Sequence, residues 1–285
     1  MNNLQKNKLK DSAFEIIGIL FTSLGILILA VLLYKIVLAG YNRINWDFLT
    51  SLPSRKPSKA GIYTAIIGTL DLMLLTIVFA IPVGVGAGIY LEEYAKKTKL
   101  SSILEINIAN LAGVPSIIYG LLGLGIFVRF FNFGGSILSG ALTISLLILP
   151  IIIVATREAI KAVPSSLKEA SFALGASKWQ TIQKVVLPSS FGGILTGIIL
   201  AMSRAIGETA PLIVVGAMSY VPFVPHSIFD TFSVLPMQIF TWTTRPQAGF
   251  AIAASAAIII LLILTFVMNG IAVYFRNRWQ TKIGK

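Results

Sequence analysis

Residues 135–154 read GSILSGALTISLLILPIIIV, a run of 20 residues without a charged side chain. The hydrocarbon core of a bilayer is about 30 Å thick, and an α-helix of about 20 apolar residues crosses it. This stretch is therefore predicted to span a membrane, and five further stretches have the same character. The six predicted spans are residues 15–38, 65–91, 103–127, 135–154, 191–218 and 250–274.

The composition agrees with a membrane protein and excludes other classes. Hydrophobic residues make up 56% of the 285 residues and charged residues only 12%, about half the charged share of a soluble domain. The formal net charge is +12. A basic domain that binds nucleic acid carries such charge on an abundant polar surface, which this chain lacks, so nucleic acid is not an expected partner. We predict an all-α polytopic bundle of six spans in a lipid bilayer.

The chain has few of the residue types that bind metals or act as nucleophiles. It has no cysteine and one histidine, His226, which removes thiolate metal sites and leaves almost nothing for Ser–His catalysis. No G-x-x-x-x-G-K-[ST] sequence occurs, so the chain is not expected to bind ATP through a P-loop. We expect no cofactor, no metal and no enzymatic activity.

The orientation follows from the positive residues beside the spans. With the N-terminus inside, most Lys and Arg residues outside the spans lie on the cytoplasmic side, and both termini lie there too. The uncharged run of the first span is too long for a signal peptide, so an uncleaved anchor is expected. The predicted organisation is an anchor helix with an extended outer linker (1–60), a transmembrane domain (61–275) and a basic cytoplasmic tail (276–285).

The cytoplasmic loop 157–189 has the pattern of two helices joined by a glycine. Ser166 and Glu169 have the spacing of a capping box, in which two side chains satisfy free donors at a helix start. Ser177 and Gln180 repeat that spacing. Gly175, between them, is the residue type that best tolerates the left-handed conformation after a helix end. Such an elbow between two spans suits docking onto another protein.

The elbow resembles the EAA signature of ABC-importer permeases, which runs EAA, three residues, G, nine residues and I-x-L-P. The matching residues are Glu169, Ala170, Ser171, Gly175, Val185, Leu187 and Pro188. Ser171 and Val185 depart mildly from the pattern. The resemblance implies that the first helix of the elbow is a coupling helix seated on a separate cytoplasmic ATPase subunit. A role of Glu169 in capping its helix is compatible with that contact.

Two charged residues lie inside the fifth predicted span. Arg204 and Glu208 are four residues apart and so share one face of a helix. A charge at membrane depth costs at least about 2.5–3.5 kcal/mol and is expected to face protein or a water-filled path. One interpretation is a structural ion pair that locks two helices. The other is an anion site, because the planar arginine fork matches the oxygens of phosphate.

The residues around this pair favour the anion site. The stretch SRAIGETAPL at 203–212 resembles the R-x-x-G-E-T-A-P-L segment of the A-type permeases (PstA) of bacterial phosphate ABC importers. The stretches AGIYLEEY at 87–94 and GVPSIIYGL at 113–121 agree with the same family. The resemblance implies a type I ABC-importer permease fold and phosphate import across the cytoplasmic membrane. It places Arg204, Glu208 and Thr209 on the substrate path.

The partners implied by this resemblance are a sister C-type permease in a heterodimer, two cytoplasmic ATPase subunits and an external phosphate-binding protein. Two alternatives remain open from the residues alone. A related oxyanion would also suit Arg204, and a self-sufficient secondary anion transporter would carry its own energy coupling. The latter often shows inverted repeats, which this sequence lacks. A membrane-embedded enzyme would need clustered His, Cys or paired acids, and only Arg204 and Glu208 are present.

Overall fold

The computed structural model describes residues 3–96, 98–218 and 220–283, and this part of the chain consists of helices and loops without a strand. In chain order the α-helices are α1 (Asn3–Gly40), α2 (Trp46–Thr50), α3 (Tyr63–Ile89), α4 (Lys99–Leu111), α5 (Ser116–Gly123), α6 (Ile137–Lys161), α7 (Ser165–Ala173), α8 (Lys178–Thr181), α9 (Leu187–Ala205), α10 (Ala210–Val215), α11 (Leu235–Thr243) and α12 (Ala248–Ile283). Three π-helical segments, Tyr90–Tyr94, Leu124–Phe130 and Ile182–Val186, continue α3, α5 and α8. The predicted all-α fold is confirmed.

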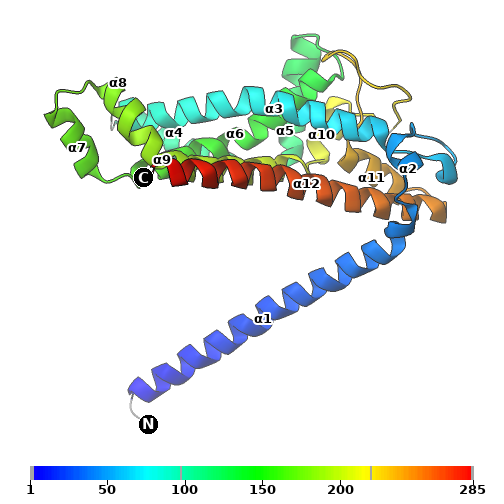
Figure 1. Cartoon of the computed structure of the whole chain (residues 1–285), viewed down its shortest axis with the longest axis horizontal. Coiled ribbons are helices and arrows are strands. Elements are labelled where there is room, and N and C mark those ends of the chain that lie inside the picture. The colour runs from blue at the N-terminus through cyan, green and yellow to red at the C-terminus, as the bar shows by residue number, and fades with distance from the viewer. Residues whose placement is uncertain (1–2, 97, 219, 284–285) are drawn as a thin grey trace.

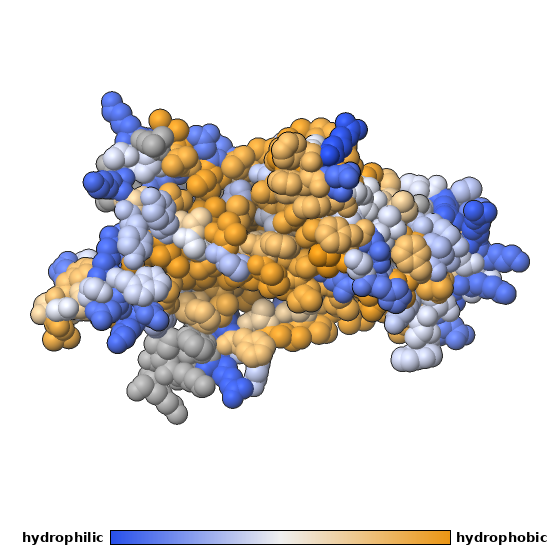
Figure 2. All heavy atoms as spheres, turned by 90° about the horizontal axis from the view of Figure 1, so that it is seen from above, coloured by the Kyte–Doolittle hydropathy of each residue, from blue (hydrophilic) through white to orange (hydrophobic). Residues whose placement is uncertain are grey.

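Five helical stretches are long and apolar enough to cross a membrane. They are Asp11–Arg43, Tyr63–Tyr94, Ile137–Lys161, Lys178–Ala205 and Ala248–Arg278. Figure 2 shows the result on the surface, where apolar side chains form a central band and polar side chains gather at both ends. The predicted tail 276–285 continues α12 as a helix, and its last two residues, like residues 1–2 of the anchor segment, lie outside the described part.

The third predicted span, 103–127, is not one straight helix. The stretches Ser101–Leu111 and Ser116–Phe130 meet at an angle of 104°. Pro115 lacks a backbone N–H and disfavours the helical conformation at Val114, so a continuous helix is interrupted there. The Tyr119 hydroxyl donates to the Leu111 carbonyl at 2.9 Å across the bend. The pair is a sixth, broken span or a re-entrant loop.

The fifth predicted span, 191–218, is wrong at both ends. The helix begins earlier, at Lys178, and ends at Ala205. It ends there because Gly207 is a poor helix former and Pro211 cannot donate to the carbonyl four residues before it. The chain then forms a new short helix, α10, with Pro211 in its first turn, where no backbone donor is needed.

α6 forms the centre of the bundle. It packs against α3 and α9, and also against α4, α5 and α10, and most of its apolar stretch is buried. Glycines of α3 allow a close approach. A Cβ at Gly84 would lie 2.6 Å from Ile152 Cγ2, and one at Gly88 would lie 2.7 Å from Thr156 Cβ. Small residues at helix contacts are typical of membrane bundles.

α1 diverges from this bundle, as Figure 1 shows, and its apolar stretch has no buried residue. It is anchored at Gly40, where a Cβ would lie 2.5 Å from the Ala256 nitrogen of α12. The segment after it was predicted as an extended linker and instead holds α2. Phe48 of α2 is fully buried and packs against Trp242, which also contacts Phe250.

The two ends of the bundle carry different segments. The first turns of α1, the last turns of α12 and the elbow helices α7 and α8 lie at the left of Figure 1, and α2 and α11 lie at the right. The start of α1 and the end of α12 therefore share one end of the molecule with the elbow. That this end faces the cytoplasm stays a prediction.

The loop 220–234 packs against the N-terminus of α6 and caps it with a backbone hydrogen bond. The N–H of Ile137 donates to the Asp230 carbonyl at 3.2 Å, which satisfies one free donor of a helix start. Asp230 also holds the loop itself, because its Oδ2 accepts from the backbone N–H groups of His226 and Ser227 at 2.9 Å each. These two hydrogen bonds hold the pKa of the Asp230 carboxyl below its usual range.

We expect the turn around Asp230 to loosen in acid. Because the folded pKa lies below the ordinary value of about 3.9, the carboxylate stabilises the turn above about pH 4, and this contribution is lost as the pH falls through the folded pKa. The measurement is the hydrogen-exchange protection factor of the His226 and Ser227 amides between about pH 6 and about pH 2. Asp230→Asn should remove the pH dependence. Protection that is constant over this range in the unmodified chain would contradict the assignment.

Candidate functional site

Arg204 and Glu208 lie at the break between α9 and α10. Arg204 is in the last turn of α9, where the helix dipole favours a cation. Glu208 precedes Thr209, the half-buried N-cap residue of α10, whose side chain makes no capping hydrogen bond. Arg204 Nε lies 3.4 Å from Glu208 Oε1. The ion pair expected from the four-residue spacing is therefore formed, although the helix does not continue through both residues.

The Arg204–Glu208 pair lies at the end of α9 away from the elbow, and its side chains are partly exposed to solvent. Arg204 comes 20 residues after Lys184, about 30 Å along the helix axis, which is close to the thickness of the hydrocarbon core. It therefore lies in the half of the span away from the elbow. The Arg204 side chain is 39% exposed and that of Glu208 is 16% exposed. The charge therefore lies toward the far boundary of the membrane, where it is expected to face water or another protein rather than the lipid chains.

The stretch 113–121 lies directly against this segment. Gly120 of α5 packs on Pro211 of α10, because a Cβ at Gly120 would lie 2.7 Å from Pro211 Cα. Tyr119 of α5 is buried, and α5 packs against α10. Two stretches that are separate in the sequence thus pack together at the helix break that follows Arg204.

Gly120→Val should push α5 away from α10. The nearest atoms to a new side chain are Pro211 Cα and the Pro211 carbonyl oxygen, at 2.7 and 2.9 Å, and backbone atoms cannot rotate away. Overpacking of this kind costs about 1–3 kcal/mol, so the melting temperature of the purified chain, followed by tryptophan fluorescence, should fall. Gly125→Val is the matched control, since nothing lies within 4 Å of a Cβ there. Equal melting temperatures for the two variants would contradict the packing described.

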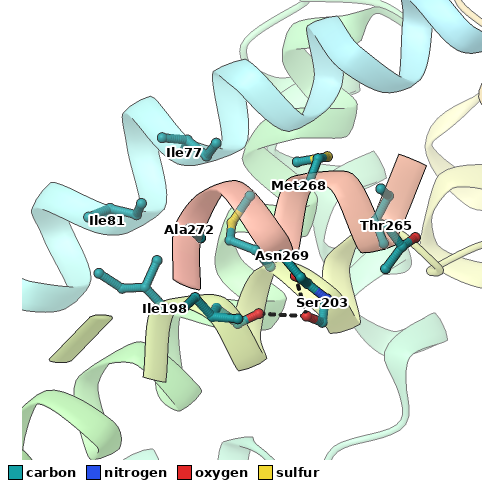
Figure 3. A pocket seen from close by; sticks show the side chains of 11 residues that line it. Ile77, Ile81, Ile198, Ser203, Thr265, Met268, Asn269 and Ala272 are labelled. Atoms are coloured by element: carbon teal, nitrogen blue, oxygen red, sulfur yellow. Dashed lines mark hydrogen bonds between the residues drawn. The ribbon is translucent and has the colours of Figure 1, made fainter. Parts of the chain in front are cut away.

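Ser203, beside Arg204, faces a different environment. Its hydroxyl donates to the Ile199 carbonyl at 2.7 Å and lies 2.8 Å from Asn269 Oδ1 of α12, as Figure 3 shows. The adjoining cavity of about 190 Å³ is lined mainly by apolar side chains of α3, α9 and α12, among them Ile77 and Met268. An anion there would lose its hydration and gain no positive partner. This cavity is therefore a poor anion site.

The predicted loop 157–189 is shorter than expected, because α6 continues to Lys161 and the next long helix starts at Lys178. Between them lie α7 and the turn at Gly175, whose φ of +82° is in the left-handed region that favours glycine. The predicted helix–glycine–helix elbow is confirmed.

One of the two predicted capping boxes is formed. Ser177 Oγ accepts from the Gln180 N–H at 3.3 Å, and Gln180 Oε1 accepts from the Ser177 N–H at 2.8 Å. The other prediction is wrong, because Pro164 is the N-cap of α7 and Ser166 lies inside the helix. No side chain caps this helix start, and the Pro164 carbonyl accepts from the Leu167 N–H at 3.2 Å.

The elbow presents large apolar side chains to solvent. The most exposed is Leu174, at 90%. The patch, here called the elbow surface, consists of Leu167, Phe172, Leu174 and Trp179. Exposed apolar side chains outside the apolar band of the bundle are typical of a surface that contacts another protein or a membrane.

The predicted coupling residues lie in two places. Glu169 and Ala170 are exposed on α7, beside the elbow surface, and Gly175 forms its turn. Leu187 and Pro188 are half-buried and line an apolar groove of about 650 Å³ between α3 and α9. Within the described part of the chain, no group of three His, Cys, Asp or Glu side chains could hold a metal ion.

Sequence reasoning missed a set of ion pairs beside the elbow. Arg157 Nη2 lies 3.4 Å from Glu92 Oε2 and 3.1 Å from Glu105 Oε1. Lys168 Nζ lies 2.6 Å from Glu93 Oε1. The pairs with Glu92 and Glu93 join residues 65 and 75 positions apart, so no local sequence pattern indicates them.

Comparisons with known sequences give a consistent group of relatives. Residues 80–281 match the family described as binding-protein-dependent transport system inner membrane component. The chain is 31% identical to the "Probable ABC transporter permease protein YqgI" of Bacillus subtilis, over 93% of this chain and 94% of that protein. It is 35% identical to the "Phosphate transport system permease protein PstA 1" of Mycobacterium tuberculosis H37Rv, over 82% and 77%. It is 33% identical to PstA of Yersinia pestis, over 87% and 83%.

Solved structures show the same fold. A chain of a bacterial alginate ABC transporter, in complex with its alginate-bound periplasmic protein, superposes with a TM-score of 0.69 at 15% identity, covering 100% of this chain and 99% of that one. A chain of the inward-facing MetNI methionine ABC transporter gives a TM-score of 0.63 at 17% identity, covering 76% and 97%. At these identities the likeness concerns the fold alone.

Proposed function

The chain belongs to the family of binding-protein-dependent transport system inner membrane components, and from this premise we propose that it is the A-type permease subunit of an ATP-driven phosphate importer. The observation that carries the proposal is the Arg204–Glu208 pair, held at a helix break of a multi-pass membrane protein. Relatives named as phosphate permeases, at 33–35% identity, support phosphate as the anion.

Arg204 binds the anion in this proposal. Its ion pair with Glu208 is made through Nε, which leaves both Nη groups to donate to phosphate oxygens. Glu208 neutralises Arg204 while the path is empty and then accepts the hydrogen bond of a P–OH group. A fully ionised tetrahedral anion such as sulfate has no proton to donate and is repelled by the carboxylate. The hydroxyl of Thr209 lies next to this pair in the chain.

A second permease subunit covers Arg204. The guanidinium is partly exposed on the surface of a single chain, and a lipid-facing charge would be costly. A sister C-type permease packed on this face would shield it and leave a path between the two subunits. The chain then contributes one wall of the path rather than a complete pore.

The elbow surface docks on the ATPase. Its exposed leucines and aromatics are expected to be buried in a complex, with Glu169, Ala170 and Gly175 shaping the contact. Each of two permeases would engage one of two ATPase subunits in the cytoplasm. Because this chain lacks a P-loop, ATP is hydrolysed in those subunits and the permease itself catalyses no reaction. The elbow end, with both termini, then faces the cytoplasm, and the end with α2 and α11 faces the external phosphate-binding protein.

Anion competition tests the proposal. The complex purified in mild detergent should contain an ATPase and a second permease, and in proteoliposomes it should take up phosphate. Arsenate, which is also partly protonated at neutral pH, should compete with phosphate, and sulfate should not. Competition by sulfate as strong as by arsenate would contradict the role given to Glu208. Purification without an ATPase partner would contradict the importer itself.

A further inference from the structure

The segment Tyr90–Tyr94 joins the elbow to the helices of the bundle. It is a π-helical turn at the end of α3 with the sequence YLEEY. The mechanism proposed above does not use it. Its two neighbouring glutamates contact different parts of the molecule, one the elbow and one the bundle. We call this segment the acidic joint.

On the elbow side the acidic joint is bound by two lysines. Lys168 of α7 lies 2.6 Å, from Nζ to Oε1, from Glu93, and the two side chains are only 23% and 11% exposed. Lys178 of α8 places Nζ 4.9 Å from the centre of the Tyr94 ring, a cation–π contact. Both arms of the elbow therefore contact this one segment of α3.

On the bundle side the acidic joint is bound by Arg157, at the end of α6. Its Nη2 contacts Glu92 of the joint and Glu105 of α4, at 3.4 and 3.1 Å. The Arg157 side chain is mostly buried, with an exposed fraction of 17%. Charges shielded from water in this way interact more strongly than surface pairs. The joint is thus fixed to α4 and α6 by one carboxylate and to the elbow by the other.

Besides the Lys168–Glu93 pair, α7 is attached mainly to the start of the long helix Lys178–Ala205. It packs on α8 and on Ile182–Val186, and Ser171 Oγ lies 2.9 Å from Thr181 Oγ1, so these contacts hold the elbow together rather than tying it to α3. The Lys168–Glu93 ion pair links α7 directly to the end of α3.

We propose that the acidic joint transmits movement of the elbow to α3, with Glu93 and Lys168 as its positioning residues. The inference rests on the proposed docking of an ATPase on the elbow surface. When the ATPase subunits move the elbow, the shielded Glu93–Lys168 pair makes the end of α3 move with it, and Arg157 carries that movement to α4 and α6. Without the pair, α7 is linked to the joint only through α8, whose Lys178 contacts Tyr94, and less of the elbow's movement reaches α3.

The test compares uptake with ATP hydrolysis in the reconstituted complex. Glu93→Gln removes the charge and keeps the shape of the side chain. The ATPase should still co-purify and hydrolyse ATP, and the phosphate taken up per ATP hydrolysed should fall about tenfold. Glu158→Gln is the matched control, because its pair with Lys161 is 4.0 Å long with side chains 64% and 66% exposed, and exposed pairs contribute little. The exchange Glu93→Lys with Lys168→Glu should restore most of the coupling.

A second measurement replaces the ion pair by a covalent tether. The chain has no cysteine, so Glu93→Cys and Lys168→Cys give two unique sites in it for a bifunctional maleimide. If the joint moves as one piece, the tethered complex should keep its uptake. Uptake abolished by the tether while ATP hydrolysis continues would overturn the proposal, as would normal coupling in Glu93→Gln. Loss of the ATPase from the wild-type complex would instead overturn the proposed function.

Discussion

Arg204→Gln should reduce phosphate uptake by at least about 100-fold, the loss typical when a charged donor to an anion is removed from a shielded site. Glutamine keeps much of the length of the side chain but loses the positive charge and the two-nitrogen fork. The variant should still assemble with its partners, because Arg204 lies in the last turn of α9 and far from the elbow surface. The measurement is uptake of labelled phosphate by proteoliposomes that contain equal amounts of complex.

Two matched variants separate charge from geometry and position. Arg204→Lys keeps the charge without the planar fork, so its uptake should fall between those of Gln and the unmodified chain. Arg276→Gln removes an arginine of α12 whose Nη1 donates to Thr196 at 3.2 Å, and it should leave uptake within about twofold of normal, since a single interhelical hydrogen bond is worth about 0.6 kcal/mol. If Arg204→Gln transports as well as Arg276→Gln, the pair with Glu208 is only structural.

Leu174→Glu should abolish uptake for a different reason, by detaching the ATPase. Leu174 is 90% exposed at the centre of the elbow and would be buried on docking. A carboxylate buried without a partner costs several kcal/mol, enough to remove most of the complex. The ATPase should no longer co-purify, whereas it should remain bound in Arg204→Gln.

The control for Leu174→Glu is Leu174→Met. Methionine keeps the apolar character and the approximate volume, so docking should persist. The permease itself should keep its melting temperature in both variants, because the side chain has little to contact in the free chain. Normal co-purification of the ATPase with Leu174→Glu would show that the elbow surface is not the docking surface.

The sequence predicted the membrane bundle well because apolar length is a local property. The stretch 135–154 needed no knowledge of its neighbours to be identified, and α6 contains all but its first two residues. The elbow could be predicted for the same reason. Gly175 and the pair Ser177–Gln180 each determine the conformation of a single turn. These features depend on backbone conformation and hydrogen bonds between residues close in the chain.

The third and fifth predicted spans were wrong because proline and glycine interrupt the helix inside a long apolar stretch. Val114–Pro115 interrupts the third span and the stretch Gly207–Pro211 interrupts the fifth. A window average counts the surrounding residues as one span, although Pro115 and Pro211 each remove a backbone donor. The position of Pro211 in the R-x-x-G-E-T-A-P-L segment was the available signal that the helix ends before Glu208.

The contacts between distant segments could not be predicted. Gly120 meets Pro211 and Glu93 meets Lys168 only because the helices pack in one particular order. The sequence contains the glutamates of the acidic joint and the lysines of the elbow, but nothing local pairs them. Such pairs follow from the topology, and the topology follows from packing around α6.

ATP-driven phosphate accumulation by the reconstituted complex tests the central claim most directly. Proteoliposomes that hold this chain, its partner permease, the ATPase subunits and the external binding protein are given labelled phosphate, with and without ATP on the ATPase side. Accumulation above the external concentration that requires ATP, and that Arg204→Gln abolishes without stopping ATP hydrolysis or assembly, is the predicted result. Accumulation that is independent of ATP, or that is equal in Arg204→Gln, would contradict it.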